Sequence, residues 1–291
     1  MASFSHSSSQ AWLSAGSQAT GKSYLTGHLK KLGIFPSSTV FIDCDELALS
    51  RPKHRGLIKS LLGQDAELYL ANPLTPLPRD LSDSEIERLR QSFSDHAFNL
   101  AKATLAQARE CLAKQQGFVF AGTMASDSGI QFAAEIKEHG GQLIFFVCLS
   151  PLERQLSRNR QRIGVSSEES LIRKRNSLFP NLEIMLQQAD GFFLFWNPDN
   201  DASPQLAAYN GAAALTPKAL RLSDTLWKQD GNEDTITLVS SAVMAEVLAD
   251  TAKTHPDCAR LLAAHFRLPI PRNFAHAVAP PAALAELAIA K

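Results

Sequence analysis

The sequence predicts an α/β protein whose parallel β-sheet is covered by helices on both faces. Two observations indicate this fold class. Short apolar runs alternate along the chain with segments whose apolar residues recur at helical spacing. Within the short runs the apolar residues follow one another without alternating polar residues, as in strands that are buried on both faces. A third observation, a glycine-containing turn between the first strand and the first helix, indicates where such a sheet would bind a ligand.

The individual elements follow from the same patterns. Five segments have the length and apolar content of strands: residues 10–15, 40–42, 117–123, 142–150 and 191–199. Five segments between and beside them have helical patterns: residues 22–33, 81–117, 128–141, 151–162 and 166–189. The segment 81–117 is one long helix or a pair, which begins at Ser82 or Asp83 as its N-cap, and 166–189 is one helix or two.

The composition changes after Asn200. Residues 201–220 are rich in Ala, Pro and Asn, residues 235–265 are predicted to be helical, and the chain ends in a segment rich in Pro and Ala. The apolar runs of this region are short for a domain of its own. We therefore expect residues 1–200 to form the core domain and residues 201–291 to form a mostly helical C-terminal elaboration packed on it.

Composition and charge exclude several classes of protein. The 291 residues include 29 Lys and Arg and 29 Asp and Glu, so no global field attracts nucleic acid, and phosphate affinity requires a local site. No run of 18 apolar residues and no secretory signal is present, so we expect a cytoplasmic protein without a membrane partner, although export by a specialised secretion machine would leave the same pattern. The four cysteines form no C-x-x-C pair, which favours free thiols over disulfides or zinc.

The segment GSQATGKS at residues 16–23 matches the phosphate-binding pattern G-x-x-x-x-G-K-[ST] between a strand and a helix. Backbone N–H groups of such a turn surround a phosphate at the positive end of the helix. Lys22 can bridge the β- and γ-phosphates, the Ser23 hydroxyl can ligate Mg²⁺, and Thr20 can add a hydrogen bond. We expect this turn to hold a nucleoside triphosphate through nine residues: Gly16, Ser17, Gln18, Ala19, Thr20, Gly21, Lys22, Ser23 and Tyr24.

Acidic residues follow the second predicted strand, in FIDCDEL. The carboxyl end of a strand in an open α/β sheet faces the ligand crevice. Asp43 and Asp45 are two positions apart, which leaves one carboxylate to face Mg²⁺ and the other to face an acceptor. We expect Glu46 to cap the following helix instead.

Other P-loop classes fit the sequence less well. The N-K-x-D motif of GTPases is absent, and the later apolar strands do not end in the Asp-Glu pair of motor or AAA-type ATPases. A small-molecule kinase fits, because its acid lies beyond the second strand and its arginines come from a later lid. Six arginines are available for such a lid: Arg154, Arg158, Arg160, Arg162, Arg173 and Arg175. Their spacing of four puts Arg154, Arg158 and Arg162 on one helix face, and we expect at least one to face the site.

The order of AWLSAGSQATGKS, FIDCDEL, FVFAGTM, RQLSRNRQR and LIRKRNSLFPNL, over roughly residues 10–200, resembles the zeta-toxin type of P-loop kinase. The resemblance implies a P-loop kinase-like fold and transfer of a phosphoryl group from ATP, with Mg²⁺, to a hydroxyl group. Family members phosphorylate the 3′-hydroxyl of UDP-N-acetylglucosamine, and a related effector branch phosphorylates NAD. The resemblance also implies a protein partner of the antitoxin or immunity type, for which residues 201–291 are a candidate surface.

The same resemblance implies roles for single residues. Lys22 and Ser23 would hold ATP and Mg²⁺, Asp45 would be the base for the acceptor hydroxyl, and Asp43 would be left for the metal. Thr123 would line the substrate pocket. The two transition-state arginines would come from four candidates: Arg158 or Arg162, with Arg173 or Arg175.

Three positions depart from the family pattern. Ala121 stands where the family has a glutamate, Ala106-Gln107 stand near another acidic position, and residues 163–166 replace a Gly-Gly-His stretch. Three hypotheses follow: a kinase with UDP-N-acetylglucosamine as its leading named substrate, a kinase of NAD or a nucleoside, and a nucleotide-binding interaction module with little activity. Asp43 and Asp45 argue against the third, because a pure binder needs no base.

Overall fold

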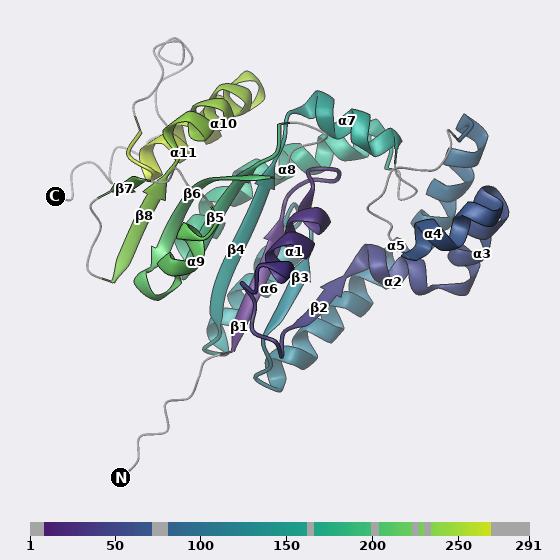
Figure 1. Cartoon of the computed structure of the whole chain (residues 1–291), viewed down its shortest axis with the longest axis horizontal. Helices are drawn as coiled ribbons and strands as arrows, with labels where there is room; N and C mark the ends of the chain where they lie inside the picture. Colours follow the sequence, from purple (N-terminus) through teal and green to yellow (C-terminus); the bar gives the residue numbers. More distant parts are fainter. Residues whose placement is uncertain are drawn as a thin grey trace.

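An eight-stranded sheet in the order β2-β3-β1-β4-β5-β6-β8-β7 forms the centre of the computed structural model (Figure 1). The structure describes residues 9–71, 81–161, 166–198, 204–222, 227–229 and 234–268, of which 93–99 and 227–229 are described by their backbone alone. Five strands are parallel: β1 (Gln10–Ala15), β2 (Val40–Asp43), β3 (Phe118–Ala121), β4 (Gln142–Leu149) and β5 (Gly191–Trp196). They confirm the predicted parallel sheet.

The central position of β1 determines where the ligand crevice lies. The chain moves from β1 to β2 and β3 on one side and then crosses to β4 on the other side. The carboxyl end of β1 is therefore the point at which the strand order reverses, and ligands of open α/β sheets bind at this point. The turn at residues 16–21 leaves β1 there and leads into α1 (Lys22–Lys31).

Alternate side chains of the strands enter two separate hydrophobic cores, because successive residues of a strand point to opposite faces. Leu13 lies in the core beneath α5 (Asp83–Ala113), α6 (Asp127–Glu138), α8 (Glu168–Gln188), α10 (Ser241–Thr254) and α11 (Pro256–His265). Trp12 lies in the core on the other face, beneath α1 and α9 (Thr216–Leu220). Figure 1 shows α1 and α9 in front of the sheet and α6 and α8 behind it. Helices thus cover both faces, as predicted.

A third hydrophobic cluster forms a helical lobe beyond β2, at the right of Figure 1. It contains α2 (Cys44–Ser50), α3 (Pro52–Leu62), the short helix Gly63–Asp65, α4 (Ala66–Ala71) and the first turns of α5. The helix α5 is single, and Ser82 rather than Asp83 caps it through a capping box with Glu85. The helix α8 is also single and contains Pro180.

The C-terminal region differs from the prediction. The prediction of a helix from residue 235 is wrong for its first five residues, since Thr235–Val239 form β8 and α10 begins at Ser241. The β-branched sequence TITLV favours a strand. Together with β6 (Gln205–Ala212) and β7 (Trp227–Gln229), β8 extends the sheet with antiparallel strands. The elaboration is therefore part of the central sheet as well as helical.

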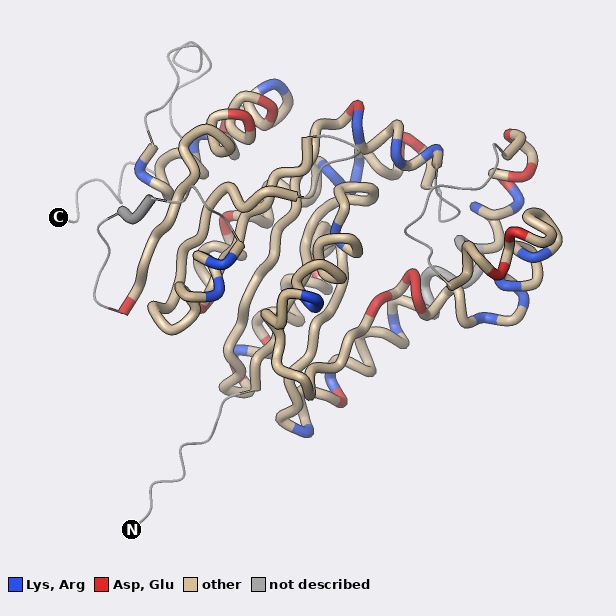
Figure 2. Tube along the Cα trace, viewed as in Figure 1, with Lys and Arg blue, Asp and Glu red and all other residues tan. Residues whose placement is uncertain are grey.

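Acidic and basic residues are interspersed along the same helices over the described part of the chain (Figure 2). Among the described helices, none is both long enough and apolar enough to cross a membrane.

Candidate active site

Two glycines shape the turn between β1 and α1. Gly16 (φ +148°) and Gly21 (φ +98°) have positive φ values that other residues rarely adopt. A Cβ atom on Gly16 would lie 2.5 Å from the carbonyl oxygen of Cys148, and one on Gly21 would overlap the side-chain amide of Asn197. Glycine is therefore required at both positions for the turn to approach the ends of β4 and β5.

The ammonium group of Lys22 lies inside this turn. Its Nζ donates to the carbonyl oxygens of Gly16 and Ser17, each at 2.7 Å. The Thr20 hydroxyl donates to the same Ser17 oxygen at 3.0 Å, and Ala19 adopts the left-handed conformation (φ +59°). The turn thus wraps around a cation at the N-terminus of a helix, where helix and side chain both favour an anion.

Asp43 connects the acidic segment to the turn. It is the last residue of β2 and the N-cap of α2: its Oδ1 accepts from the Asp45 backbone N–H at 2.7 Å. Its Oδ2 lies 3.4 Å from the Ser23 hydroxyl, which donates to it. The expectation that Glu46 caps this helix is wrong; Glu46 is an exposed residue of the first turn.

The acidic segment has an unusual electrostatic environment. Burial, followed by the charge of Asp45, raises the pKa of Asp43 from 3.8 to about 6, and the charge of Lys22 partly opposes this shift. Burial and the Asp45 and Asp43 carboxylates raise the pKa of the Cys44 thiol to about 12, which favours the protonated thiol at neutral pH. Lys174 of α8 is half-buried; burial lowers its pKa while the Asp45 carboxylate opposes that shift. Lys174 therefore places a positive charge in the surroundings of Asp45, a role that no motif of the sequence indicates.

Arg158 of α7 (Leu152–Arg160) contacts the turn directly. One terminal nitrogen donates to the Ser150 hydroxyl at 3.1 Å and to the Ala19 carbonyl oxygen at 3.4 Å, and the other donates to Asn197 Oδ1 at 3.1 Å. Asn197 in turn donates to the Thr20 carbonyl oxygen at 2.8 Å. The structure thus brings Arg158 and the phosphate-binding turn together. Ser150 and Asn197 were not predicted as site residues, although each directly follows the carboxyl end of a strand, where ligands of open α/β sheets bind.

The other predicted site residues lie in different environments. Arg175 is buried, donates to the Ser150 carbonyl oxygen at 2.7 Å and forms an ion pair with Asp250 at 2.9 Å, a placement that favours a structural role over the predicted phosphate contact. Arg173 is exposed on α8, and Arg162 lies outside the described residues. Thr123 is half-buried, two residues beyond β3. Tyr24 is exposed, with its ring parallel to that of His28.

Comparison with known proteins gives only distant similarity. No protein-family model and no curated protein matches the chain. Among solved structures, a protein of the PezAT chromosomal toxin–antitoxin system of Streptococcus pneumoniae is similar over 69% of this chain and 72% of that one, at 15% identity and a TM-score of 0.41. One chain of the AvrRxo1-ORF1:AvrRxo1-ORF2 complex is similar over 90% of this chain and 81% of that one, at 16% identity and a TM-score of 0.42. Shikimate kinase from Acinetobacter baumannii is similar over 67% of this chain and 86% of that one, at 15% identity and a TM-score of 0.34.

The fold class follows from three features of the structure. Its strand order, its phosphate-binding turn after β1 and its acidic residues after β2 are those of a P-loop kinase-like α/β fold. The low identities and TM-scores assign no activity, so the function has to be inferred from the site.

Proposed function

We propose that this protein is an ATP- and Mg²⁺-dependent phosphotransferase that acts on a hydroxyl group of a nucleotide-like small molecule. The observation that carries the proposal is the link between two segments at one edge of the sheet. The Ser23 hydroxyl, beside the Lys22 turn, meets the Asp43 carboxylate 3.4 Å away, and Asp45 follows on the same helix. These contacts support a site in which Lys22 binds phosphate, Ser23 and Asp43 hold the metal ion and Asp45 is the base, because all four residues lie at the same edge of the sheet.

The turn is suited to the phosphates of ATP. Lys22 now donates to two carbonyl oxygens, and phosphate oxygens would replace them as acceptors. The Ser23 hydroxyl and the Asp43 carboxylate are hard oxygen donors, and Mg²⁺ prefers such ligands in small number. When bound, the ion neutralises charge on the β- and γ-phosphates. The contact of Arg158 with the Ala19 carbonyl oxygen supports this arginine as the candidate that contacts the transferred phosphoryl group.

Asp45 is the proposed base. It accepts the proton of the acceptor hydroxyl while the new O–P bond forms and the bond between the γ-phosphorus and the bridging oxygen breaks, so that ADP leaves. Lys174 adds a positive charge near this carboxylate. Thr123, beyond the neighbouring strand β3, is a candidate for acceptor contact.

The finer assignment is to the zeta-toxin type of kinase, which rests on the order of the sequence motifs. UDP-N-acetylglucosamine is the acceptor that this resemblance names first, but Ala121 and Ala106-Gln107 lack the acidic side chains of the family pattern and argue against it. NAD or a nucleoside is the alternative acceptor. An antitoxin or immunity-type partner and the division of the chain at residue 200 stay predictions.

Transfer from ATP labelled on the γ-phosphate tests the proposal. The protein is incubated with Mg²⁺ and, separately, with UDP-N-acetylglucosamine, NAD, a nucleoside panel and a metabolite extract. We expect one labelled small molecule that depends on Mg²⁺ and is absent with Lys22→Ala. Binding of ATP without transfer to any acceptor would support the interaction module instead.

A further inference from the structure

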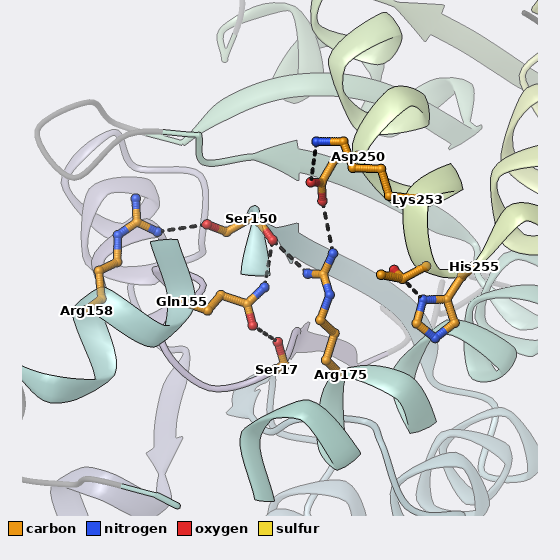
Figure 3. A network of polar contacts seen from close by, with 9 residues as sticks. Ser17, Ser150, Gln155, Arg158, Arg175, Asp250, Lys253 and His255 are labelled. Atoms are coloured by element: carbon orange, nitrogen blue, oxygen red, sulfur yellow. Dashed lines mark hydrogen bonds and ion pairs between the residues drawn. The ribbon is translucent and has the colours of Figure 1, made fainter. Parts of the chain in front are cut away.

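A chain of buried hydrogen bonds joins the phosphate-binding turn to the C-terminal helix α10 (Figure 3). The Ser17 hydroxyl donates to Gln155 Oε1 at 2.5 Å, and Gln155 Nε2 donates to the Ser150 carbonyl oxygen at 2.6 Å. Arg175 donates to the same oxygen at 2.7 Å, and its other terminal nitrogen pairs with Asp250 at 2.9 Å. Elements far apart in the sequence thus meet at one peptide carbonyl, that of Ser150.

The members of this chain are almost inaccessible to solvent. Ser17, Ser150, Gln155 and Arg175 are exposed by 3% or less, and the Asp250 side chain by 12%. A buried polar group that loses its partner has no water to replace it, so removing one member disturbs its neighbours. The geometry of this series of hydrogen bonds is therefore strongly constrained.

Ser150 also contacts Arg158, the arginine beside the phosphate-binding turn. Its carbonyl oxygen accepts hydrogen bonds from Gln155 and Arg175, and its side-chain hydroxyl accepts one from Arg158 at 3.1 Å. A shift of Ser150 would move Ser17 of the phosphate-binding turn, because Gln155 connects the two residues. It would also move Arg158, which contacts Ala19 of the same turn.

We propose that the Arg175–Asp250 ion pair positions the nucleotide site from a distance. Asp250 orients the guanidinium, the guanidinium holds the Ser150 carbonyl, and Ser150 sets Gln155, Ser17 and Arg158. Arg175 is thus a positioning residue, and α10 is a component of the nucleotide site although its ion pair touches no phosphate-binding residue directly. This inference rests on the proposed nucleotide site.

Simple anchoring of α10 does not require this ion pair. Met244, Val247 and Leu248 of the same helix are buried in the main hydrophobic core. A buried ion pair contributes little net stability compared with apolar packing, but loss of one partner leaves an uncompensated charge. The consequences of removing Asp250 should therefore reach the residues that Arg175 contacts.

The test measures binding of a fluorescent ATP analogue with Mg²⁺ by the full chain, together with the thermal unfolding midpoint. We expect Asp250→Ala to raise the dissociation constant at least fivefold and Asp250→Asn, which keeps an acceptor oxygen but loses the charge, to have a smaller effect. Lys253→Ala is the matched control, because Lys253 pairs with Asp250 from the exposed side at 3.8 Å. It should leave the dissociation constant within twofold.

A second control separates positioning from general destabilisation. Leu248→Ala opens a cavity beneath the same helix and should lower the unfolding midpoint without changing nucleotide affinity. Asp250→Ala and Ser17→Ala form a double-mutant cycle. The double variant should bind the ATP analogue no more than twofold more weakly than the weaker of the two single variants, because both substitutions break the same series of hydrogen bonds.

The outcomes are distinguishable. Unchanged affinity in Asp250→Ala and Asp250→Asn, or equal loss of affinity in Leu248→Ala, overturns the positioning role alone. A wild-type protein that does not bind the ATP analogue overturns both this inference and the proposed function.

Discussion

Lys22 is the residue on which the proposed chemistry depends most directly. Its Nζ lies within the turn, bonded to two carbonyl oxygens, so it is already placed for phosphate. Loss of one preorganised transition-state contact of this kind costs on the order of 3 kcal/mol or more. We expect Lys22→Ala to lower kcat/KM by more than about a hundredfold with little change in thermal unfolding. A variant that turns over ATP at the parental rate would show that the site is elsewhere.

Asp45 should be needed for transfer and not for nucleotide binding. The Asp43 carboxylate faces the Ser23 hydroxyl, and the Asp45 backbone N–H donates to that carboxylate, so Asp43 rather than Asp45 adjoins the phosphate-binding turn. We expect Asp45→Asn to abolish phosphoryl transfer and to leave the dissociation constant for the ATP analogue within about twofold. The matched control is Glu46→Gln, the exposed neighbour. Undiminished transfer in Asp45→Asn would favour Asp43 as the base.

Asp43 should reduce the stability of the ligand-free protein at neutral and alkaline pH. Its pKa rises from 3.8 to about 6 on folding, so its contribution to stability is fully present below pH 3.8 and is lost as the pH rises through 6. Asparagine keeps an oxygen for the Asp45 N–H and so keeps the cap. We expect Asp43→Asn to be more stable than the wild type by on the order of 1–2 kcal/mol at pH 8.

The check is thermal unfolding at pH 8 and at pH 4, each without nucleotide. The gain should shrink at pH 4, because both proteins then carry a mostly uncharged group at this position. The same variant should lose the Mg²⁺ dependence of ATP binding. A variant that is less stable than the wild type at pH 8 would contradict the electrostatic account of Asp43.

Single residues of the site were predictable to different degrees. The motif GSQATGKS is local, so the positions of Lys22 and Ser23 followed from the sequence. Arg175 could not be distinguished from Arg173 by spacing alone, because its partner Asp250 is 75 residues away along the chain. The helix cap made by Asp43 was assigned to Glu46 because both are acidic residues at a strand-to-helix junction. They differ in backbone conformation, since Asp43 is extended at the N-cap position and Glu46 lies in the first turn of α2.

At the scale of one element, α1 offers a comparison between two glycines. Gly21 caps the helix with φ +98°, and a Cβ there would overlap the Asn197 amide. Gly27 lies within the helix, and a Cβ there would meet no atom within 4 Å. We expect Gly21→Ala to destabilise the protein by about 1–3 kcal/mol and to weaken nucleotide binding. Gly27→Ala should stabilise it by roughly 0.5–1 kcal/mol.

Chemical denaturation and ATP-analogue binding measure both effects. If Gly21→Ala binds nucleotide as tightly as the wild type, the contact between Asn197 and the turn does not shape the phosphate site. If Gly27→Ala destabilises the protein, the helix does not have the open surface at that position that the structure describes.

The strands of the sheet were predictable where apolar residues decided them. β1, β3, β4 and β5 are nearly uninterrupted apolar runs, and their parallel pairing followed from that pattern. β6, with the sequence QLAAYNGA, contains Ala, Asn and Gly, which are uncommon in strands. Its antiparallel pairing with β5 and β8 overrides this weak preference, and a long-range pairing of this kind is invisible in a local pattern.

At the scale of the whole molecule, the C-terminal region and the nucleotide site form one continuous structure. β6 and β8 extend the sheet that carries the phosphate-binding turn, and α10 and α11 share the hydrophobic core of β1 and β4. The chain from Ser17 to Asp250 adds a polar connection between them. A protein partner that binds α10 would therefore act on a helix already connected to the nucleotide site.

The proposed choice of acceptor also belongs to this scale, because the candidate residues for acceptor contact come from several elements. Ala121 ends β3 beside Asp43 of β2, and Ala106 and Gln107 are exposed on α5. These positions replace acidic residues in the zeta-toxin pattern. Each missing charge-assisted hydrogen bond to a sugar hydroxyl removes about 1.5–3 kcal/mol. We therefore expect poor phosphorylation of UDP-N-acetylglucosamine, with kcat/KM more than tenfold below that for another nucleotide-like hydroxyl compound.

A side-by-side kinetic comparison of UDP-N-acetylglucosamine, NAD and common nucleosides measures this preference. Ala121→Glu supplies a matched variant, because it restores one carboxylate at the end of the strand that pairs with β2. It should raise kcat/KM for the UDP-sugar relative to the other acceptors and leave affinity for the ATP analogue unchanged, since the phosphate-binding turn is untouched. Efficient turnover of the UDP-sugar by the wild type would mean that Thr123 or Ser126 supplies the contacts and that the acidic residues are dispensable.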